Sequence, residues 1–229
     1  QSLNNWDVSG VTDMEEMFSD ASSFNGNISS WDVSNVINMR RMFYQANDFN
    51  QDLNSWNVSK VTNMYSMFNG ASSFNQPLNN WDVSSVIDMS GMFSAASSFD
   101  QDLSGWDVSG VTDMSGMFYG ADNFDGNLSG WNLSSDPNVY NMFNNADNFT
   151  GIGVDTWDVS NITDMGPMFK SASSFNGNIG SWDISKVTNM NSMFNGASSF
   201  NQDLSSWNVS SLTSATDILS NSNLSKIGR

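Results

Sequence analysis

The chain has no cysteine and no histidine among its 229 residues. Without cysteine it can form no disulfide framework and has no thiolate nucleophile. Without histidine it lacks the commonest general base and the commonest transition-metal ligand of proteins. These two absences remove many of the side chains on which active sites and metal centres are usually built.

Positive charge is also scarce, because 7 basic residues face 24 acidic ones and the net charge is −17. A surface this acidic repels nucleic-acid phosphates and anionic membranes, so neither is an expected partner. No apolar run reaches the roughly 18 residues of a membrane span, and no signal peptide opens the chain. The sequence begins in mid-pattern, so we expect a fragment or processed form whose export or anchoring signal lies outside it.

What the chain does contain is a repeat. Tryptophan recurs every 25 residues, with one step of 26. Methionines follow in pairs three residues apart, and phenylalanines come directly after the second methionine and again six residues later. The unit reads L-x-x-W-D-V-S-x-V-T-D-M-x-x-M-F-x-x-A-x-x-F-N-x-x. The nine tryptophans are Trp6, Trp31, Trp56, Trp81, Trp106, Trp131, Trp157, Trp182 and Trp207.

A unit of this length cannot bury its apolar side chains alone, whereas stacked units share one continuous core. The sequence therefore predicts a solenoid of nine coils with the Trp, Met and Phe side chains inside. We assign residues 1–219 to this single solenoid and 220–229 to a degenerate C-terminal cap or linker. The extra residue near 150–154 predicts a local bend or bulge in the stack.

Two periods within each copy suggest its local structure. Trp106 and Val108 alternate with polar residues, which predicts a short strand starting near each tryptophan. The spacing from Val111 through Met114 and Met117 is that of one stripe of a short α-helix or 3₁₀ segment. The expected fold class is therefore an α/β repeat solenoid whose coils each contain a short strand and a short helical turn.

The W-D-V-S and M-x-x-M-F elements resemble the repeat of the BspA-like leucine-rich-repeat surface proteins, a bacterial family of unknown function. The resemblance runs from Leu3 to about Leu219. It implies a leucine-rich-repeat-like, right-handed solenoid with strands on one face and short helical turns on the other. It also implies an exported, surface-attached protein linked to adhesion, with no catalytic residues to carry over.

The polar residues beside each predicted strand form two columns that could bind a ligand. One column supplies divalent-metal candidates, although no calcium motif supports them and a solvated, charged face is the alternative. Its carboxylates are Asp7, Asp32, Asp82, Asp107, Asp158 and Asp183, with Asn57, Asn132 and Asn208 in the remaining coils. The second column is a candidate ligand face made of Ser9, Ser34, Ser59, Ser84, Ser109, Ser134, Ser160, Ser185 and Ser210.

Two further polar columns have structural interpretations. The first, expected to cap and turn the chain, comprises Asp13, Asn38, Asn63, Asp88, Asp113, Asn138, Asp164 and Asn189. The second follows each closing phenylalanine and is expected to bond to backbone between coils. It comprises Asn25, Asn50, Asn75, Asp100, Asp125, Asn176 and Asn201.

A few large polar residues vary between copies, so core packing did not fix them. Tyrosine and arginine are favoured at interfaces, although a solvated arginine pair is an alternative. These residues are Arg40, Arg41, Tyr44, Tyr65, Tyr119, Tyr140, Lys60, Lys170 and Lys186.

Carboxylates that recur in every coil do not form the singular constellation of an active site, so we predict a non-enzymatic protein. The expected function is an extracellular or cell-surface adhesive and structural module. It would contact a protein or glycan through a polar, acidic face, without a cofactor. The alternatives are a self-assembling extracellular subunit and an ordered-surface binder of divalent cations or ice.

Overall fold

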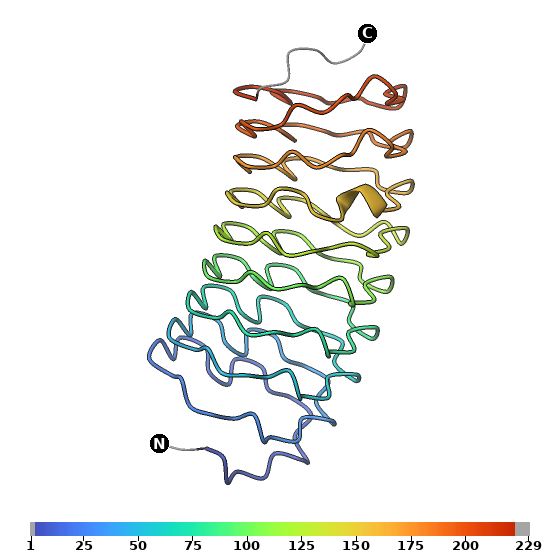
Figure 1. The fold of residues 1–229 in the computed structure, drawn as a ribbon. Coiled ribbons are helices and arrows are strands. Elements are labelled where there is room, and N and C mark those ends of the chain that lie inside the picture. Colours follow the sequence, from blue (N-terminus) through green and yellow to red (C-terminus); the bar gives the residue numbers. More distant parts are fainter. Residues whose placement is uncertain (1–2, 223–229) are drawn as a thin grey trace.

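The computed structural model describes residues 3–222, and over this range the chain forms one stack of similar coils. In Figure 1 the coils succeed one another from the blue N-terminal end to the red C-terminal end, which lie at opposite ends of the stack. Within residues 3–222, no helix is long and apolar enough to cross a membrane. The stack of repeats predicted from the tryptophan spacing is confirmed.

The interior of the stack consists of the repeated apolar residues. The tryptophans from Trp31 to Trp182 are at most 5% exposed, and most core methionines and phenylalanines are fully buried. Phe118 stacks on Phe124 of its own coil at 4.0 Å and on Phe143 of the next coil at 5.3 Å. Successive coils thus share one aromatic core, as the sequence predicted.

Each tryptophan after the first also ties its coil to the preceding one. The Trp106 Nε1–H donates to the backbone oxygen of Leu78 at 3.0 Å. The same bond, between a tryptophan and the preceding coil, recurs through to Trp207 and Ile179. The indole is therefore both the largest buried group of a coil and a hydrogen-bond donor that fixes the coil-to-coil register.

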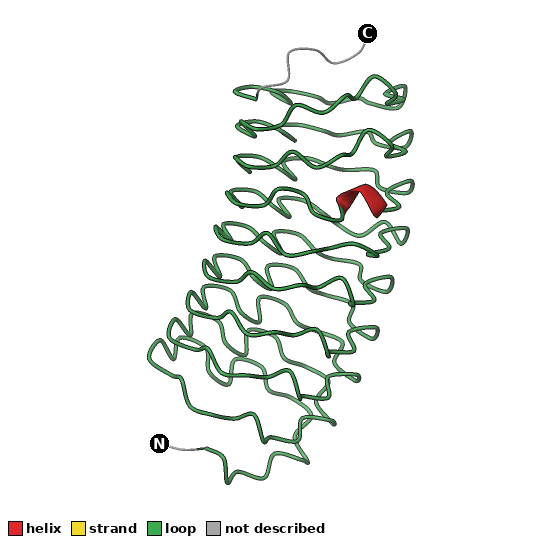
Figure 2. Ribbon diagram, viewed as in Figure 1, coloured by secondary structure: helices red, strands yellow, loops and turns green. Residues whose placement is uncertain are grey.

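The predicted strand and helical turn of each coil are not confirmed. The one helix among residues 3–222 is the 3₁₀ helix η1 (Val154–Thr156), and the remaining coils are turns and extended segments (Figure 2). No strand forms at the tryptophans in this range. Isolated parallel bridges connect the coils, nearly all of them in the column that runs from Asp13 to Ser214.

The described coils contain no regular helix at the methionines because alternate backbone N–H groups there bond to the next coil instead of to their own. Met114, Gly116 and Phe118 donate to carbonyl oxygens of the following coil at 2.8–2.9 Å, whereas the Met117 N–H closes a turn onto Met114. Gly116 and Gly120 have positive φ values of 58° and 64°. A left-handed residue interrupts a helix after one turn, and the freed donors then pair between coils.

The asparagine column after each closing phenylalanine forms the expected ladder. The Oδ1 of Asn50 accepts the N–H of Asn75 at 3.0 Å, one coil further on. Asn75 in turn accepts the N–H of Asp100 at 2.9 Å. Thr150 continues the ladder through its bond to Asp125 at 2.8 Å. These side chains satisfy backbone donors that each coil would otherwise leave unpaired.

The inserted residue produces a local bulge, as predicted. Helix η1 absorbs the extra length, and Gly153 at its N-cap has a φ of 89°. Trp131 and Trp157 on either side still stack at 6.1 Å. The stack therefore continues without interruption through the irregular coil.

The two ends of the described stack are less buried than its middle. Trp6 is 55% exposed in the first coil, and Val209 is 46% exposed in the last. Of the C-terminal segment predicted as a cap or linker, residues 223–229 lie outside the described residues.

Candidate ligand-binding groove

The aspartate and serine columns predicted as a metal and ligand face form a local turn in every coil. The Oδ1 of Asp107 accepts the Ser109 backbone N–H at 3.0 Å and its hydroxyl at 2.6 Å. The backbone bond recurs in all nine coils, with asparagine accepting in three of them. These polar groups therefore hold the chain in its turn, which leaves them less available to a ligand.

These bonds favour the charged form of the carboxylates. The Ser109 hydroxyl, helped by the Ser109 N–H, lowers the pKa of Asp107 below its ordinary value. The pKa values of Asp32 and Asp158 are lowered for the same reason, by Ser34 and Ser160.

The metal candidates do not converge. Within residues 3–222, no three acidic side chains come close enough together to hold a metal ion. The Asp–Ser turn already uses one oxygen of each carboxylate. The prediction of a divalent-cation site therefore gains no support at Asp7, Asp32, Asp82, Asp107, Asp158 or Asp183.

The lowered pKa values predict a stability loss in acid. A carboxyl whose pKa is lower in the folded state contributes stability above its unfolded value of about 3.9, and this contribution disappears as the pH falls through the folded pKa. A variant with Asp32→Asn, Asp107→Asn and Asp158→Asn should therefore lose less stability than the parent between about pH 7 and about pH 3. Thermal unfolding at both pH values measures the difference.

The natural sequence supplies the precedent for this variant. Asn57 accepts the Ser59 N–H at 3.2 Å and the Ser59 hydroxyl at 2.8 Å, so an amide maintains the turn. The variant should therefore fold as the parent does at pH 7. Equal losses on acidification would show that these carboxylates do not cause the acid response.

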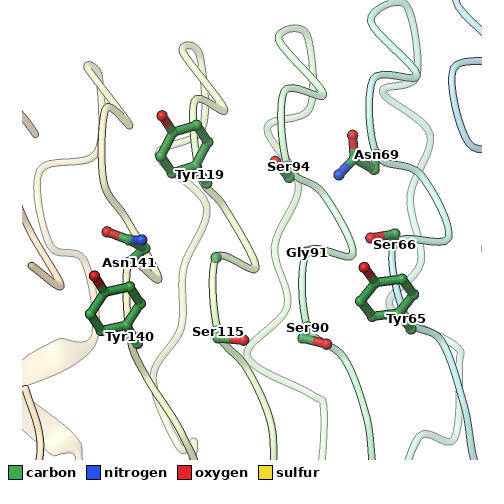
Figure 3. Close-up of a pocket in the computed structure, with 11 residues that line it drawn as sticks. Tyr65, Ser66, Asn69, Ser90, Gly91, Ser94, Ser115, Tyr119, Tyr140 and Asn141 are labelled. Carbon is green, nitrogen blue, oxygen red and sulfur yellow. The ribbon is translucent and has the colours of Figure 1, made fainter.

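A different side of the stack carries a groove with three tyrosines. Tyr65 and Tyr140 occupy the same repeat position, two residues before the second methionine, three coils apart. The two coils between them have Ser90 and Ser115 at this position, and the resulting depression has a volume of about 340 Å³. Figure 3 shows the four residues in one row, with Tyr119 in a second row beside it.

Small residues keep the floor of the groove open. Gly91 and Gly116 have positive φ values of 61° and 58°, and a Cβ at Gly91 would lie 2.9 Å from the Ser66 Oγ. In earlier coils the same position carries a longer side chain, such as Glu16 or Arg41. The groove therefore arises where two consecutive coils carry only small side chains between large ones.

Neighbouring coils support the two end tyrosines. The Arg40 guanidinium lies 5.1 Å from the ring centroid of Tyr65 and also pairs with Glu15. At the opposite end, a Cβ at Gly166 would lie 3.2 Å from the ring of Tyr140. Glycine there lets the Tyr140 ring approach the next coil closely. Both rings thus have a support on the side away from the groove.

Several polar groups of the groove have no hydrogen-bond partner among the described residues. Within residues 3–222, the following side-chain groups have no hydrogen bond: the hydroxyls of Tyr65, Tyr119, Tyr140, Ser94 and Ser115, and the side-chain amide of Asn69. Tyr119 and Tyr140 are also 41% and 48% exposed. The groove thus offers aromatic surface and free donors and acceptors together, a combination typical of binding sites.

Comparison with known proteins places the chain in a family. The family model described as "Mycoplasma protein of unknown function, DUF285" matches residues 1–70, 51–152 and 141–226. The chain belongs to this family. No curated protein matches the chain of this DUF285 member.

Two solved structures share a weak likeness with the DUF285 chain. A leucine-rich-repeat protein of Leptospira interrogans aligns with a TM-score of 0.31 at 9% identity, covering 89% of this chain and 56% of that one. TLR13, in its complex with ssRNA13, aligns with a TM-score of 0.32 at 10% identity, covering 89% and 35%. The chain therefore spans about half or less of these proteins. Both scores are too low to support a structural argument.

The large polar residues that vary between the repeat copies of this DUF285 chain lie on different parts of its surface. Tyr65, Tyr119 and Tyr140 meet in the groove. Arg41 lies over the ring of Tyr44 at 4.1 Å, and neither residue lines the groove. The lysines lie elsewhere, with Lys60 bonded to Asn35 at 2.8 Å, Lys186 bonded to Asn161 at 2.5 Å, and Lys170 lining another surface depression.

Sequence reasoning missed the groove floor. The residues concerned are small, and each is unremarkable in its own copy. The signal lies in the alignment of copies, because Ser90 and Ser115 occupy the position that carries Glu15, Arg40 and Tyr65 in the first three coils.

Proposed function

We propose that this DUF285-family chain is a non-enzymatic binding module of the cell surface or extracellular space. It acts as an adhesive and structural scaffold that holds a protein or glycan ligand. The contact surface is the tyrosine groove, defined by Tyr65, Tyr119, Tyr140 and the small residues between them. The aspartate and serine columns, in this proposal, maintain the coil shape.

The observation that carries the proposal is the grouping of three tyrosines with unbonded hydroxyls in one groove. Tyrosine is enriched at binding hot spots because it combines a large apolar ring with a polar end. In the aspartate column, by contrast, the carboxylate is already bonded within its own coil, as in the Asp107–Ser109 turn. Surface location rests on the resemblance of the repeat to the BspA-like surface proteins.

An ordered-surface function has weaker support. Ice or mineral binding through the threonine column would need free hydroxyls on a regular lattice. The hydroxyls of Thr112, Thr188 and Thr213 instead donate to backbone oxygens of the preceding coil at 3.0–3.2 Å. We therefore retain the groove as the binding surface.

The proposal predicts that the tyrosines determine binding. Purified protein should bind at least one member of a panel of immobilised extracellular proteins and glycans. The variant with Tyr65→Ala, Tyr119→Ala and Tyr140→Ala should lose at least about tenfold in affinity for that member, because hot-spot residues dominate binding energy. Surface plasmon resonance measures the affinity.

Tyr44→Ala is the matched control, because Tyr44 is a tyrosine packed under Arg41 outside the groove. Its affinity should equal that of the parent, and thermal unfolding should show all variants folded. Failure of the parent to bind any member of the panel would contradict the function. Unchanged binding by the triple variant would contradict the groove as its site.

A further inference from the structure

We propose that the tyrosine groove binds a neutral oligosaccharide lying along the axis of the stack between Tyr65 and Tyr140. This inference rests on the proposed function and names the class of ligand. It follows from the charge, the shape and the hydrogen-bonding groups of the groove.

The charge of the lining selects a neutral ligand. The eleven lining residues include no aspartate, glutamate, lysine or arginine, although the net charge of the chain is −17. An anionic ligand would meet the negative field of the whole molecule. A cationic ligand would find no carboxylate in the lining, and the nearby Asp88 and Asp113 each accept a turn N–H at 2.8–2.9 Å.

The shape of the groove suits a short, extended chain. Tyr65 and Tyr140 are three coils apart, which corresponds to about 14 Å at about 4.8 Å per coil. The floor between them consists of Ser90, Gly91, Ser115 and Gly116, so it is open along the stack axis. The volume of about 340 Å³ lies at the lower end of the range for ligand sites, about 300–1,000 Å³.

The polar groups of the lining match a hydroxyl-rich ligand. Each serine and tyrosine hydroxyl can donate and accept, and the asparagine amide offers both functions as well. A sugar ring has the same mixture, with C–H faces that pack on aromatic rings and hydroxyl edges that donate and accept. Tyr119, beside the floor, can contact a ring face while Ser94 and Ser115 contact its edge.

A peptide fits this lining less well. Recognition of an extended peptide in an aromatic groove depends on apolar pockets between rings. Here the space between Tyr65 and Tyr140 contains serine side chains and glycine backbone.

The test uses the whole chain and neutral oligosaccharides built from glucose, mannose or N-acetylglucosamine, in increasing length. Isothermal titration calorimetry should detect binding to at least one series, with affinity rising with length until the chain spans the groove. Sulfated or carboxylated forms of the same series should bind more weakly. Tighter binding of the charged forms would overturn the inference.

A blocking variant tests the site without unfolding the coil. Ser115→Tyr places a ring in the floor, and the fold should tolerate it because Tyr140 occupies the same repeat position in the next coil and Tyr65 occupies it two coils earlier. We expect at least a tenfold loss of oligosaccharide affinity. The matched control is Thr216→Tyr, an exposed residue at that repeat position in the last coil, which should bind as the parent does.

The outcomes separate the two proposals. If Ser115→Tyr blocks a protein or peptide ligand while no oligosaccharide binds, the sugar inference is wrong and the groove remains the binding site. If oligosaccharides bind equally well to the parent and to Ser115→Tyr, the sugar inference is also wrong, because the sugar then binds elsewhere. Absence of any ligand across both panels contradicts the proposed function itself.

Discussion

Replacement of Trp106 by alanine should lower the free energy of unfolding by about 3–5 kcal/mol, the typical cost of truncating a large buried aromatic residue. Trp106 is 2% exposed and stacks on Trp81 at 6.4 Å. Its loss would open a cavity in the middle of the stack and would leave the Leu78 carbonyl without its indole donor. Urea unfolding followed by circular dichroism measures the change.

Trp6→Ala is the matched control for this variant, because it alters the same repeat position in the first coil. Trp6 is 55% exposed and packs on Trp31 from one side only, at 6.3 Å. Its truncation should cost less than about 1 kcal/mol, as at a largely exposed site. Similar losses for the two variants would show that position in the stack does not determine the contribution of an indole.

The core could be predicted from the sequence because burial leaves a direct periodic signal. Trp recurs in every copy and Met and Phe at fixed positions in most of them, and only stacking of copies removes these side chains from water. The asparagine ladder was predictable for the same reason, since Asn50 and Asn75 recur at one position and bond to backbone one coil apart. Repetition thus specified which side chains face inward and which connect coils.

The path of the backbone was not predictable from that periodicity. A stripe at spacings of three and four residues describes a helix, but it also describes consecutive tight turns that share one buried side. The deciding feature is the positive φ after the first methionine, at Gly116 in one coil and at Ser66 in another. Because serine seldom adopts this conformation, its presence there gave no local sequence signal.

The groove was partly predictable. Tyr65, Ser90, Ser115 and Tyr140 are 25 residues apart in sequence, so an alignment of copies places them in one row. The sequence also marked Tyr119 as a variable interface residue. What it could not supply is the hydrogen-bond state of these groups, because whether a hydroxyl is free depends on the neighbours that the folded coils bring to it.

Gly153→Ala should cost about 2–5 kcal/mol, which combines a strained backbone conformation with a steric clash against the backbone of the preceding coil. Gly153 has a φ of 89°, and an added Cβ would lie 2.2 Å from the backbone nitrogen of Ser129. The nearest atoms belong to the backbone of Ser129 and Leu128, so no flexible side chain could move aside to relieve the clash. The clash would separate the inserted coil from its neighbour where Trp157 donates to Leu128. A fall in the urea midpoint measures the loss.

Gly120→Ala separates the two causes of that cost, because Gly120 has a φ of 64° and no atom within 4 Å of an added Cβ. Ala95 occupies the same repeat position one coil earlier with a φ of 53°, so alanine is compatible with this turn. The expected cost is about 1 kcal/mol, from the left-handed conformation alone. If the two glycine variants were equally destabilised, backbone conformation would explain both losses. A much larger loss at Gly153 would show that close packing of the inserted coil against its neighbour holds the irregular part of the stack together.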